Sequence, residues 1–252
     1  MADAIRVCVS GYRGRVGQVL VPALQSEPGI EYVGGIGHGD DLAAFLHEKR
    51  PRVLVDFTKP AEALHIALAA VAAGASPVVG TTGIPADGID KLETACKDKG
   101  LGGIVAPNFA VGAVLMMYLA DLAAPHFDAA EIIELHHAGK LDAPSGTALS
   151  TARRLAAHRK DRPFAHRKAE KETLAGTRGG EEGNVAVHSV RLPGFVADQE
   201  VIFGLAGQTL TIAHRTTSRE AYVPGVLLAI RKVTSEPRFY RGLDELLGLS
   251  VG

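Results

Sequence analysis

Short apolar runs alternate with Ala- and Leu-rich stretches of helical period over residues 5–106, and this alternation constrains the fold more than any other feature. The run Val53–Phe57 is almost continuously apolar, which is typical of a strand buried on both faces of a sheet. Such alternation favours a parallel sheet covered by helices. We expect strands at Ile5–Ser10, Glu31–Gly35, Val53–Phe57, Pro77–Val79 and Gly103–Ala106, and helices at Gly14–Gln25, Asp40–Lys49 (capped by Asp40), Ala61–Ala73 and Ile89–Lys99.

The pattern changes after Pro107, where extended runs follow one another with little helix between them. Residues 159–184 are charged, rich in glycine and poor in apolar side chains, so we expect a long mobile loop. Ser218 is expected to cap a final helix, Arg219–Val233, that returns to the first domain. The other expected elements are helices Ala110–Ala123 and Thr147–His158 and strands Glu131–His136, Val185–Arg191, Gln199–Leu205 and Thr209–His214.

Charge and composition exclude several classes of partner. The formal net charge is −1, which gives no basic excess to attract nucleic acid. The apolar stretches are too short for a membrane span or are interrupted by glycine and charge. Asp3 leads directly into the first strand, so no signal peptide is expected, and two cysteines fit a reducing compartment. We therefore expect a cytoplasmic protein with no nucleic-acid and no membrane partner.

A glycine-rich turn, Gly11-Tyr-Arg-Gly14-Arg-Val-Gly17, stands between the first strand and the first helix. Glycines there permit a tight turn and close backbone approach, and the helix N-terminus favours a pyrophosphate. The position after the first strand favours a dinucleotide over a purely steric turn. The sequence thus predicts an α/β fold with a Rossmann-like dinucleotide-binding domain, residues 1–108 and 215–252. Residues 109–214 are expected to form a second, α+β domain with a mixed, largely antiparallel sheet.

The second strand lacks the acidic residue that usually contacts the adenosine ribose, because no carboxylate precedes Asp40 after Gly35. Arg13 and Arg15 lie in the glycine loop instead. A guanidinium without a neighbouring carboxylate favours a 2′-phosphate, so we expect NADPH to be used at least as well as NADH. In the alternative interpretation, both arginines only neutralise the pyrophosphate.

Three further turns follow the carboxyl ends of expected strands, where ligands of open α/β sheets bind. They are Asp56-Phe57-Thr58, Gly80-Thr81-Thr82-Gly83 and Ala106-Pro107-Asn108-Phe109. Small and hydroxyl-bearing residues suit a ribose and a nicotinamide. Taken singly, each hydroxyl turn is also consistent with an ordinary structural turn.

The run Glu134–Ala148, Glu-Leu-His-His-Ala-Gly-Lys-Leu-Asp-Ala-Pro-Ser-Gly-Thr-Ala, combines a proton source, a cation and a helix N-terminus. Histidine can donate a proton near neutral pH, and backbone N–H groups at a helix N-terminus favour an anion. The spacing does not give His-x-x-x-His, so no metal site is expected, and Ser145 is not in the Gly-x-Ser-x-Gly of a serine hydrolase. Surface histidines would explain His137 alone. The run predicts a site that binds and protonates a small carboxylated molecule.

These segments, together with His188-Ser-Val-Arg191 and Val223-Pro224-Gly225, resemble the dihydrodipicolinate reductase family, whose members are also called 4-hydroxy-tetrahydrodipicolinate reductases. The resemblance covers nearly the whole chain in order. It implies reduction of 4-hydroxy-tetrahydrodipicolinate, a dicarboxylate cyclic imine, by NADPH or NADH in diaminopimelate and lysine biosynthesis. It also implies hinge closure between the domains, and a homotetramer held by the sheet of the second, substrate-binding and oligomerisation domain.

The resemblance carries roles to particular residues of this chain. His136 becomes the proton donor, with Lys140 beside it as donor or carboxylate partner, and Arg191 becomes a further catalytic or structural residue. The implied substrate contacts are His137, Lys140, Ser145, Gly146 and Thr147. The implied cofactor contacts are Gly11, Arg13, Gly14, Arg15, Val16, Phe57, Thr58, Gly80, Thr82, Ala106, Asn108 and Phe109.

Two departures from the family pattern stand out. One is the absent acidic residue near Gly37, and the other is the segment after Arg191, with Pro193 in place of a small residue and with Asp198 and Gln199 where a histidine is common. The alternatives are a reductase of a different cyclic imine carboxylate and a nucleotide-sensing binding module. The intact pair of His136 and Lys140 argues against pure sensing.

Overall fold

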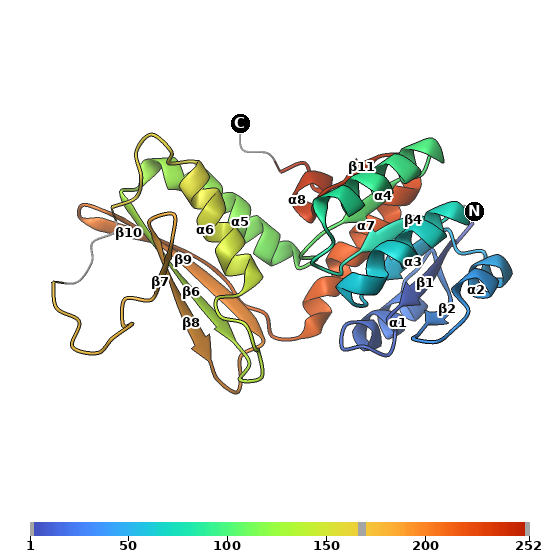
Figure 1. The fold of residues 1–252 in the computed structure, drawn as a ribbon, viewed down its shortest axis with the longest axis horizontal. Helices are drawn as coiled ribbons and strands as arrows, with labels where there is room; N and C mark the ends of the chain where they lie inside the picture. Colours follow the sequence, from blue (N-terminus) through green and yellow to red (C-terminus); the bar gives the residue numbers. More distant parts are fainter. Residues whose placement is uncertain (1–2, 166–169, 250–252) are drawn as a thin grey trace. The chain divides into compact units, whose positions relative to one another are not determined.

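The computed structural model describes residues 3–165 and 170–249, which fall into two compact units (Figure 1). Unit 1 comprises residues up to 111 together with 219–249, and unit 2 spans residues 112–218. The boundaries at 111/112 and 218/219 lie a few residues after the expected ones at 108/109 and 214/215. Unit 1 is therefore built from two separate parts of the chain.

Among its described residues, unit 1 has a six-stranded parallel sheet in the order β11-β5-β4-β3-β1-β2. Because β1 pairs with both β2 and β3, the direction of winding reverses beside β1, and the carboxyl ends of these strands form a ligand-binding edge. The α/β prediction is confirmed. The strands are β1 (Ile5–Ser10), β2 (Ile30–Ile36), β3 (Val53–Asp56), β4 (Ser76–Val79), β5 (Gly103–Val105) and β11 (Phe239–Tyr240).

Helices cover both faces of this sheet. Cys8 and Leu54 pack with residues of α2 and α3, and Val79 packs with residues of α3 and α4. Helices α1 and α7 contact each other and lie on the opposite face (Figure 1). Burial of these apolar faces stabilises the sheet, at about 25 cal/mol per Å² removed from water. The helices are α1 (Gly17–Ser26), α2 (Leu42–Lys49), α3 (Pro60–Ala72), α4 (Ala86–Asp98), α7 (Val223–Ser235) and α8 (Leu243–Leu246).

Two expected helix caps are wrong. The cap of α2 is Asp41, whose carboxylate accepts a hydrogen bond from the N–H of Ala44 at 3.0 Å. Asp40 instead turns back to accept the N–H of Gly37 at 2.8 Å. Ser218 does not cap a long helix either, because a 3₁₀ turn at Arg219–Tyr222 precedes α7.

Unit 2 contains, in its described residues, a five-stranded sheet in the order β10-β9-β6-β8-β7. Only β6 and β8 pair in parallel, so the prediction of a mixed, largely antiparallel sheet is confirmed. Helices α5 and α6 cover one face, over a core that includes Ile132, Leu155 and Phe203 (Figure 1). The elements are α5 (Val111–Ala123), a 3₁₀ turn (Ala124–His126), β6 (Ala129–His136), α6 (Gly146–Ala157), β7 (Gly180–Glu182), β8 (Val185–Arg191), β9 (Ala197–Leu205) and β10 (Gln208–His214).

The expectation of one long loop over residues 159–184 is wrong at both ends of that segment. Arg159 is buried and donates a hydrogen bond to the Pro125 carbonyl at 3.1 Å, and Phe164 packs against Phe203 in the core. Near the other end, Gly180–Glu182 forms strand β7. Residues 166–169 of the expected loop lie outside the described residues. One aromatic anchor therefore orders a stretch whose composition resembles a loop.

Candidate active site

The glycine loop in unit 1 is packed so tightly at Gly11 and Gly17 that neither position has room for a side chain. Gly11 has φ of +78°, and a Cβ atom there would lie 2.6 Å from the carbonyl oxygen of Phe57. A Cβ atom on Gly17 would lie 2.5 Å from the carbonyl oxygen of Gly11. Because α1 begins at Gly17, the loop leads the bare backbone into a helix N-terminus, where N–H groups favour an anion.

A cavity of about 700 Å³ opens beside this loop at the carboxyl ends of β1, β2 and β3. The Arg13 guanidinium stacks on the Tyr12 ring, 5.0 Å from its centroid, and Arg13 also lines the cavity. The predicted cofactor residues in its lining are Gly11, Arg13, Gly14, Phe57 and Thr58.

The expected absence of a carboxylate near Gly37 is wrong. Asp40 lines the same cavity as Arg13, and its carboxylate is held beside Gly37 by the hydrogen bond to that residue's N–H. Glu62 also lines the cavity. The end of β2 itself carries no carboxylate, but the turn at residues 37–40 brings the Asp40 side chain back to that place.

A second cavity, of about 350 Å³, is lined by Arg15, Val16, Gly80 and Thr82. Phe57 and Thr58 line both cavities. The Phe57 ring lies against Gly80, where a Cβ atom would approach it to 2.2 Å. The two arginines of the glycine loop therefore line different cavities.

Asp56, at the end of β3, organises the turns around the second cavity and was not predicted as a site residue. Its buried carboxylate accepts hydrogen bonds from the hydroxyls of Thr58 at 2.8 Å and Thr81 at 2.6 Å. Burial raises the pKa of the Asp56 carboxyl, and the hydrogen bonds from Thr81, Thr58 and Ser10 oppose this effect. The available sequence signal was a carboxylate directly after a continuously apolar strand.

The remaining predicted cofactor residues do not belong to the described linings of these two cavities. Ala106 and Phe109 are buried, and the Phe109 ring meets Phe57 edge-on at 5.8 Å between centroids. The Asn108 side-chain oxygen accepts the N–H of Ala110 at 2.8 Å. These residues shape the segment that follows β5.

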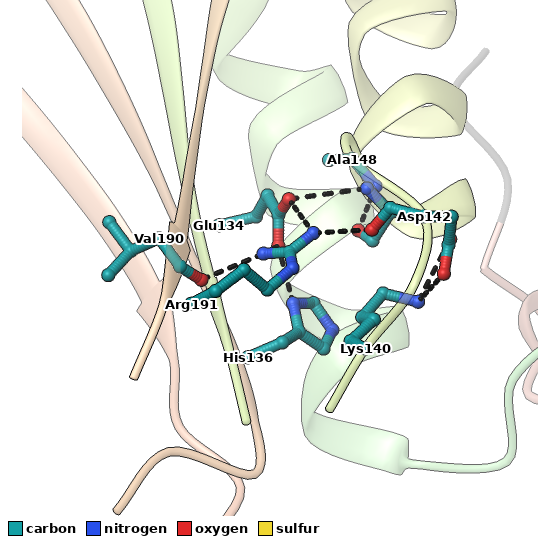
Figure 2. Close-up of polar contacts among 8 residues, drawn as sticks. Glu134, His136, Lys140, Asp142, Ala148, Val190 and Arg191 are labelled. Carbon is teal, nitrogen blue, oxygen red and sulfur yellow. Dashed lines mark hydrogen bonds and ion pairs between the residues drawn. The ribbon is translucent and has the colours of Figure 1, made fainter. Parts of the chain in front are cut away.

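In unit 2, the predicted site is organised around Glu134, a fully buried side chain on β6 (Figure 2). Arg191, on the neighbouring strand β8, donates two hydrogen bonds to the Glu134 carboxylate, at 2.9 and 2.7 Å. The same carboxylate contacts Nδ1 of His136 and accepts the N–H of Ser145 at 3.3 Å. Burial alone would raise the pKa of Glu134, but hydrogen bonds from Arg191, Ser189 and His136 hold it below its usual value.

Lys140 lies on the loop that faces His136 (Figure 2). Its ammonium group donates to both carboxylate oxygens of Asp142, at 2.7 and 2.9 Å. Arg191 also donates to the Asp142 carbonyl at 2.7 Å, which ties this loop to the sheet. Burial lowers the pKa of His136, as do the charges of Lys140 and Arg191, while Glu134 acts in the opposite direction.

The predicted anion site at the start of α6 has a buried serine as its cap. The Ser145 hydroxyl oxygen accepts the N–H of Ala148 at 3.1 Å, and its own N–H is given to Glu134. Gly146 and Thr147 form the first positions of the helix, where amide N–H groups have no partner within the helix itself. The His137 carbonyl accepts the N–H of Lys140 at 3.1 Å, which closes the turn before the loop.

The unusual residues on β9 hold unit 2 together. Asp198 is buried and accepts the N–H of Thr216 at 2.8 Å. Gln199 is also buried and donates to the Thr151 hydroxyl on α6 at 2.8 Å. These contacts give Asp198 and Gln199, which belong to the second departure from the family pattern, a structural role.

Neither a metal-binding cluster nor a membrane-spanning helix occurs among the described residues. Within residues 3–165 and 170–249, no group of three or more histidine, cysteine or acidic side chains is placed to hold a metal ion. None of the helices in the described part of the chain has both the length and the apolar character needed to cross a membrane.

Comparison with known proteins agrees with this geometry. A family model for the N-terminus of dihydrodipicolinate reductase matches residues 5–109, and one for the C-terminus matches residues 112–247. The 4-hydroxy-tetrahydrodipicolinate reductase of Moorella thermoacetica is 48% identical over 267 residues, covering 98% of this chain and 99% of the relative. The enzyme of the same name from Bacillus subtilis is 40% identical over 264 residues, covering 97% and 98%.

Solved structures give the same result. Dipicolinate-bound dihydrodipicolinate reductase from Paenisporosarcina sp. TG-14 matches with a TM-score of 0.88 and 36% identity, covering 96% of this chain and 99% of that chain. An amine dehydrogenase from Mycobacterium smegmatis matches with a TM-score of 0.64 and 14% identity, covering 98% of this chain and 97% of the dehydrogenase chain. At that identity, the match shows a common fold alone. The chain therefore belongs to the dihydrodipicolinate reductase family.

Proposed function

We propose that this protein is an NAD(P)H-dependent oxidoreductase that reduces 4-hydroxy-tetrahydrodipicolinate to tetrahydrodipicolinate, in diaminopimelate and lysine biosynthesis. The observation that carries the proposal is the arrangement of His136, Lys140 and the N-terminus of α6 around Glu134. Full-length relatives named for this activity, at 40–48% identity, support it. Dipicolinate, bound in the related structure, is itself a small dicarboxylate.

The substrate offers two carboxylates, and this chain offers two kinds of group to bind them. Lys140 supplies a charge-assisted hydrogen bond, and the amides of Gly146 and Thr147 supply a helix N-terminus, with His137 and Ser145 beside them. Two carboxylates held at once fix which face of the ring reacts, and such orientation provides much of the rate gain in reactions of this kind.

His136 is the proposed proton donor for the ring nitrogen, with Lys140 as the neighbouring cation or an alternative donor. The 4-hydroxyl group of the substrate leaves as water, and the cofactor, when bound, would supply the hydride that reduces the resulting conjugated system. Negative charge then develops toward the ring nitrogen, where a fixed cation stabilises it and a nearby acid quenches it. The half-buried position of His136 keeps bulk water from competing for that contact.

The residues of unit 1 fit a dinucleotide. The glycine loop leaves its backbone accessible to a phosphate group, and a Cβ atom at Gly11 or Gly17 would clash with neighbouring backbone atoms. The loop borders the larger cavity. We propose that Gly11, Arg13, Gly14, Arg15, Val16, Phe57, Thr58, Gly80 and Thr82 hold the cofactor, with Ala106, Asn108 and Phe109 completing the site. Arg13 can pair with a 2′-phosphate and Asp40 can accept a ribose hydroxyl, so both NADPH and NADH are proposed as cofactors.

We further propose a cytoplasmic homotetramer assembled through unit 2. Helices α5 and α6 cover one face of its sheet, and the other face carries Ile133, Val190 and Ile202. This open face also carries charged residues such as Glu200, which pairs with Ile133, and its three apolar side chains suit self-association.

The function is tested by following oxidation of NADPH and of NADH with freshly made substrate from the synthase reaction. We expect turnover by the wild-type protein, and a fall in kcat of roughly 10²–10⁴-fold for His136→Gln and for Lys140→Ala. Calorimetry with dipicolinate in the presence of NADPH checks that the His136→Gln protein still folds and binds. Wild-type turnover of another cyclic imine carboxylate, with none of this substrate, would contradict the proposal.

A further inference from the structure

The Glu134 carboxylate lies behind the proposed proton donor rather than beside the substrate. It is fully buried, whereas the His136 side chain retains 14% of its exposure and the Lys140 side chain 21%. Its contacts are the Arg191 guanidinium, Nδ1 of His136 and the N–H of Ser145. It therefore holds a residue of β6, a residue of β8 and the start of α6 together at one point.

We propose that Glu134 is a positioning residue that fixes the neutral ring of His136 as its Nδ1–H tautomer and directs Nε2, the atom that takes up and then donates the catalytic proton, toward the substrate. The proposal rests on the reductase function given above. Both oxygens of Glu134 accept hydrogen bonds from Arg191, whose guanidinium is always charged, so the carboxylate is ionised and can only accept. The contact with His136 then requires a proton on Nδ1.

The charges around His136 give Glu134 a second effect. The charged groups that face the ring are Glu134 on its own strand, Arg191 on β8 and Lys140 on the loop, and Lys140 is paired with Asp142. Arg191 and Lys140 both oppose protonation of the ring, and Glu134 favours it. Without the Glu134 charge, His136 would be protonated only at lower pH.

The chain supplies a matched control on the same strand. Glu131 lies on the opposite face of β6 and also contacts an arginine, Arg178, and a histidine, His188, the latter at 2.9 Å. Glu131 therefore has the same types of partner as Glu134, which contacts Arg191 and His136. Neither Glu131 nor its partners contact His136 or Lys140 in the described structure.

The experiment compares Glu134→Gln with Glu131→Gln. A glutamine at position 134 can donate its amide proton to Nδ1, which would place the histidine proton on Nε2 and remove the neighbouring charge. We expect kcat of Glu134→Gln to fall by about 10²-fold or more, by analogy with the carboxylate that orients the histidine of serine proteases. The alkaline fall in kcat should move to lower pH. Glu131→Gln should keep that midpoint at its wild-type position.

Histidine ¹⁵N NMR of the ligand-free wild-type protein gives a readout that depends neither on activity nor on the folding of Glu134→Gln. The His136 signals, assigned by their loss in His136→Gln, should report the Nδ1–H tautomer in the neutral ring. A neutral wild-type ring protonated on Nε2 would overturn the proposal, as would an unchanged pH profile in a folded Glu134→Gln protein. A wild-type protein inactive on the substrate would instead count against the proposed function.

Discussion

At the scale of single residues, the charged side chains of the candidate site in unit 2 form pairs that differ in their exposure to water. Lys140 donates to the Asp142 carboxylate, and Arg191 is held by Glu134. The Asp142 side chain is 60% exposed, so its pairing with Lys140 is open to water and weak. A substrate carboxylate can therefore replace Asp142 on Lys140 at little cost, while the buried Glu134–Arg191 pair stays in place.

Arg13 and Asp40 allow a test of cofactor selection, because they line one cavity while Arg15 lines another. We expect Arg13→Ala to weaken NADPH more than NADH, since only NADPH carries the 2′-phosphate. Asp40→Asn should weaken NADH more. Loss of one charge-assisted contact corresponds to roughly tenfold in kcat/KM, or about 1.5 kcal/mol.

Arg15→Ala is the control for that pair, and it should reduce kcat/KM for both cofactors to a similar extent. Steady-state kinetics with each cofactor at saturating substrate give all six ratios. Equal losses of NADPH and NADH in Arg13→Ala would mean that this arginine serves only the pyrophosphate.

At the scale of elements, the end of β3 depends on a carboxyl group whose charged form is disfavoured by burial. Asp56 is buried, and its hydrogen bonds with Thr58 and Thr81 join two turns that line the second cavity. Burial raises its pKa in the folded protein. The folded state therefore binds this proton more readily than the unfolded state does.

Asp56→Asn tests that description through the pH dependence of stability. A raised folded pKa gives a stabilising contribution that is present below the unfolded pKa of about 3.9 and is lost as pH rises through the folded pKa. The free energy of unfolding of the variant, minus that of the wild type, should therefore increase as the pH is raised from 4. Urea unfolding at a series of pH values measures the difference. A difference independent of pH would show that Asp56 titrates alike in both states.

Most helices and strands were predictable from the sequence because their apolar residues recur with the period of a helix or a strand. β1 and β8 have their expected bounds, and the other expected strands shift by one or two residues, whereas β7 and β11 were not expected. The errors arose where one side chain outweighed composition, as when Phe164 anchors the supposed loop. Glu134 was overlooked because a polar residue in an alternating strand is expected to face water, whereas this one faces a guanidinium.

At the scale of the whole molecule, the sequence predicted the two groups of candidate site residues but not the hydrogen bonds that connect them to other residues. Motifs identified the glycine loop and the run from Glu134 to Ala148. Their partners come from distant positions, such as Arg191 for Glu134 and Asp56 for Thr81, and short-range spacing carries no information about such pairs. Asp40 shows the same limit, because a turn returns it to the strand end.

Assembly is the property that belongs to the whole molecule, and we expect native mass spectrometry to give a mass of four chains. Ile202→Glu should produce smaller species, because it places an unpaired charge on the open face of the sheet in unit 2. The control is Leu228→Glu, which alters an exposed leucine on α7 of unit 1 and should leave the mass unchanged. A single-chain mass for the wild type at micromolar concentration would exclude the tetramer.

The discontinuous unit 1 has a consequence during synthesis on the ribosome. Strand β5 pairs with β11, and α7 packs on β4, yet both partners are translated only after the whole of unit 2. At usual translation speeds, residues 112–218 take roughly 5–20 s to appear. For that interval the nascent sheet exposes an unpaired edge and an apolar face, and surfaces of this kind make incomplete chains prone to aggregation.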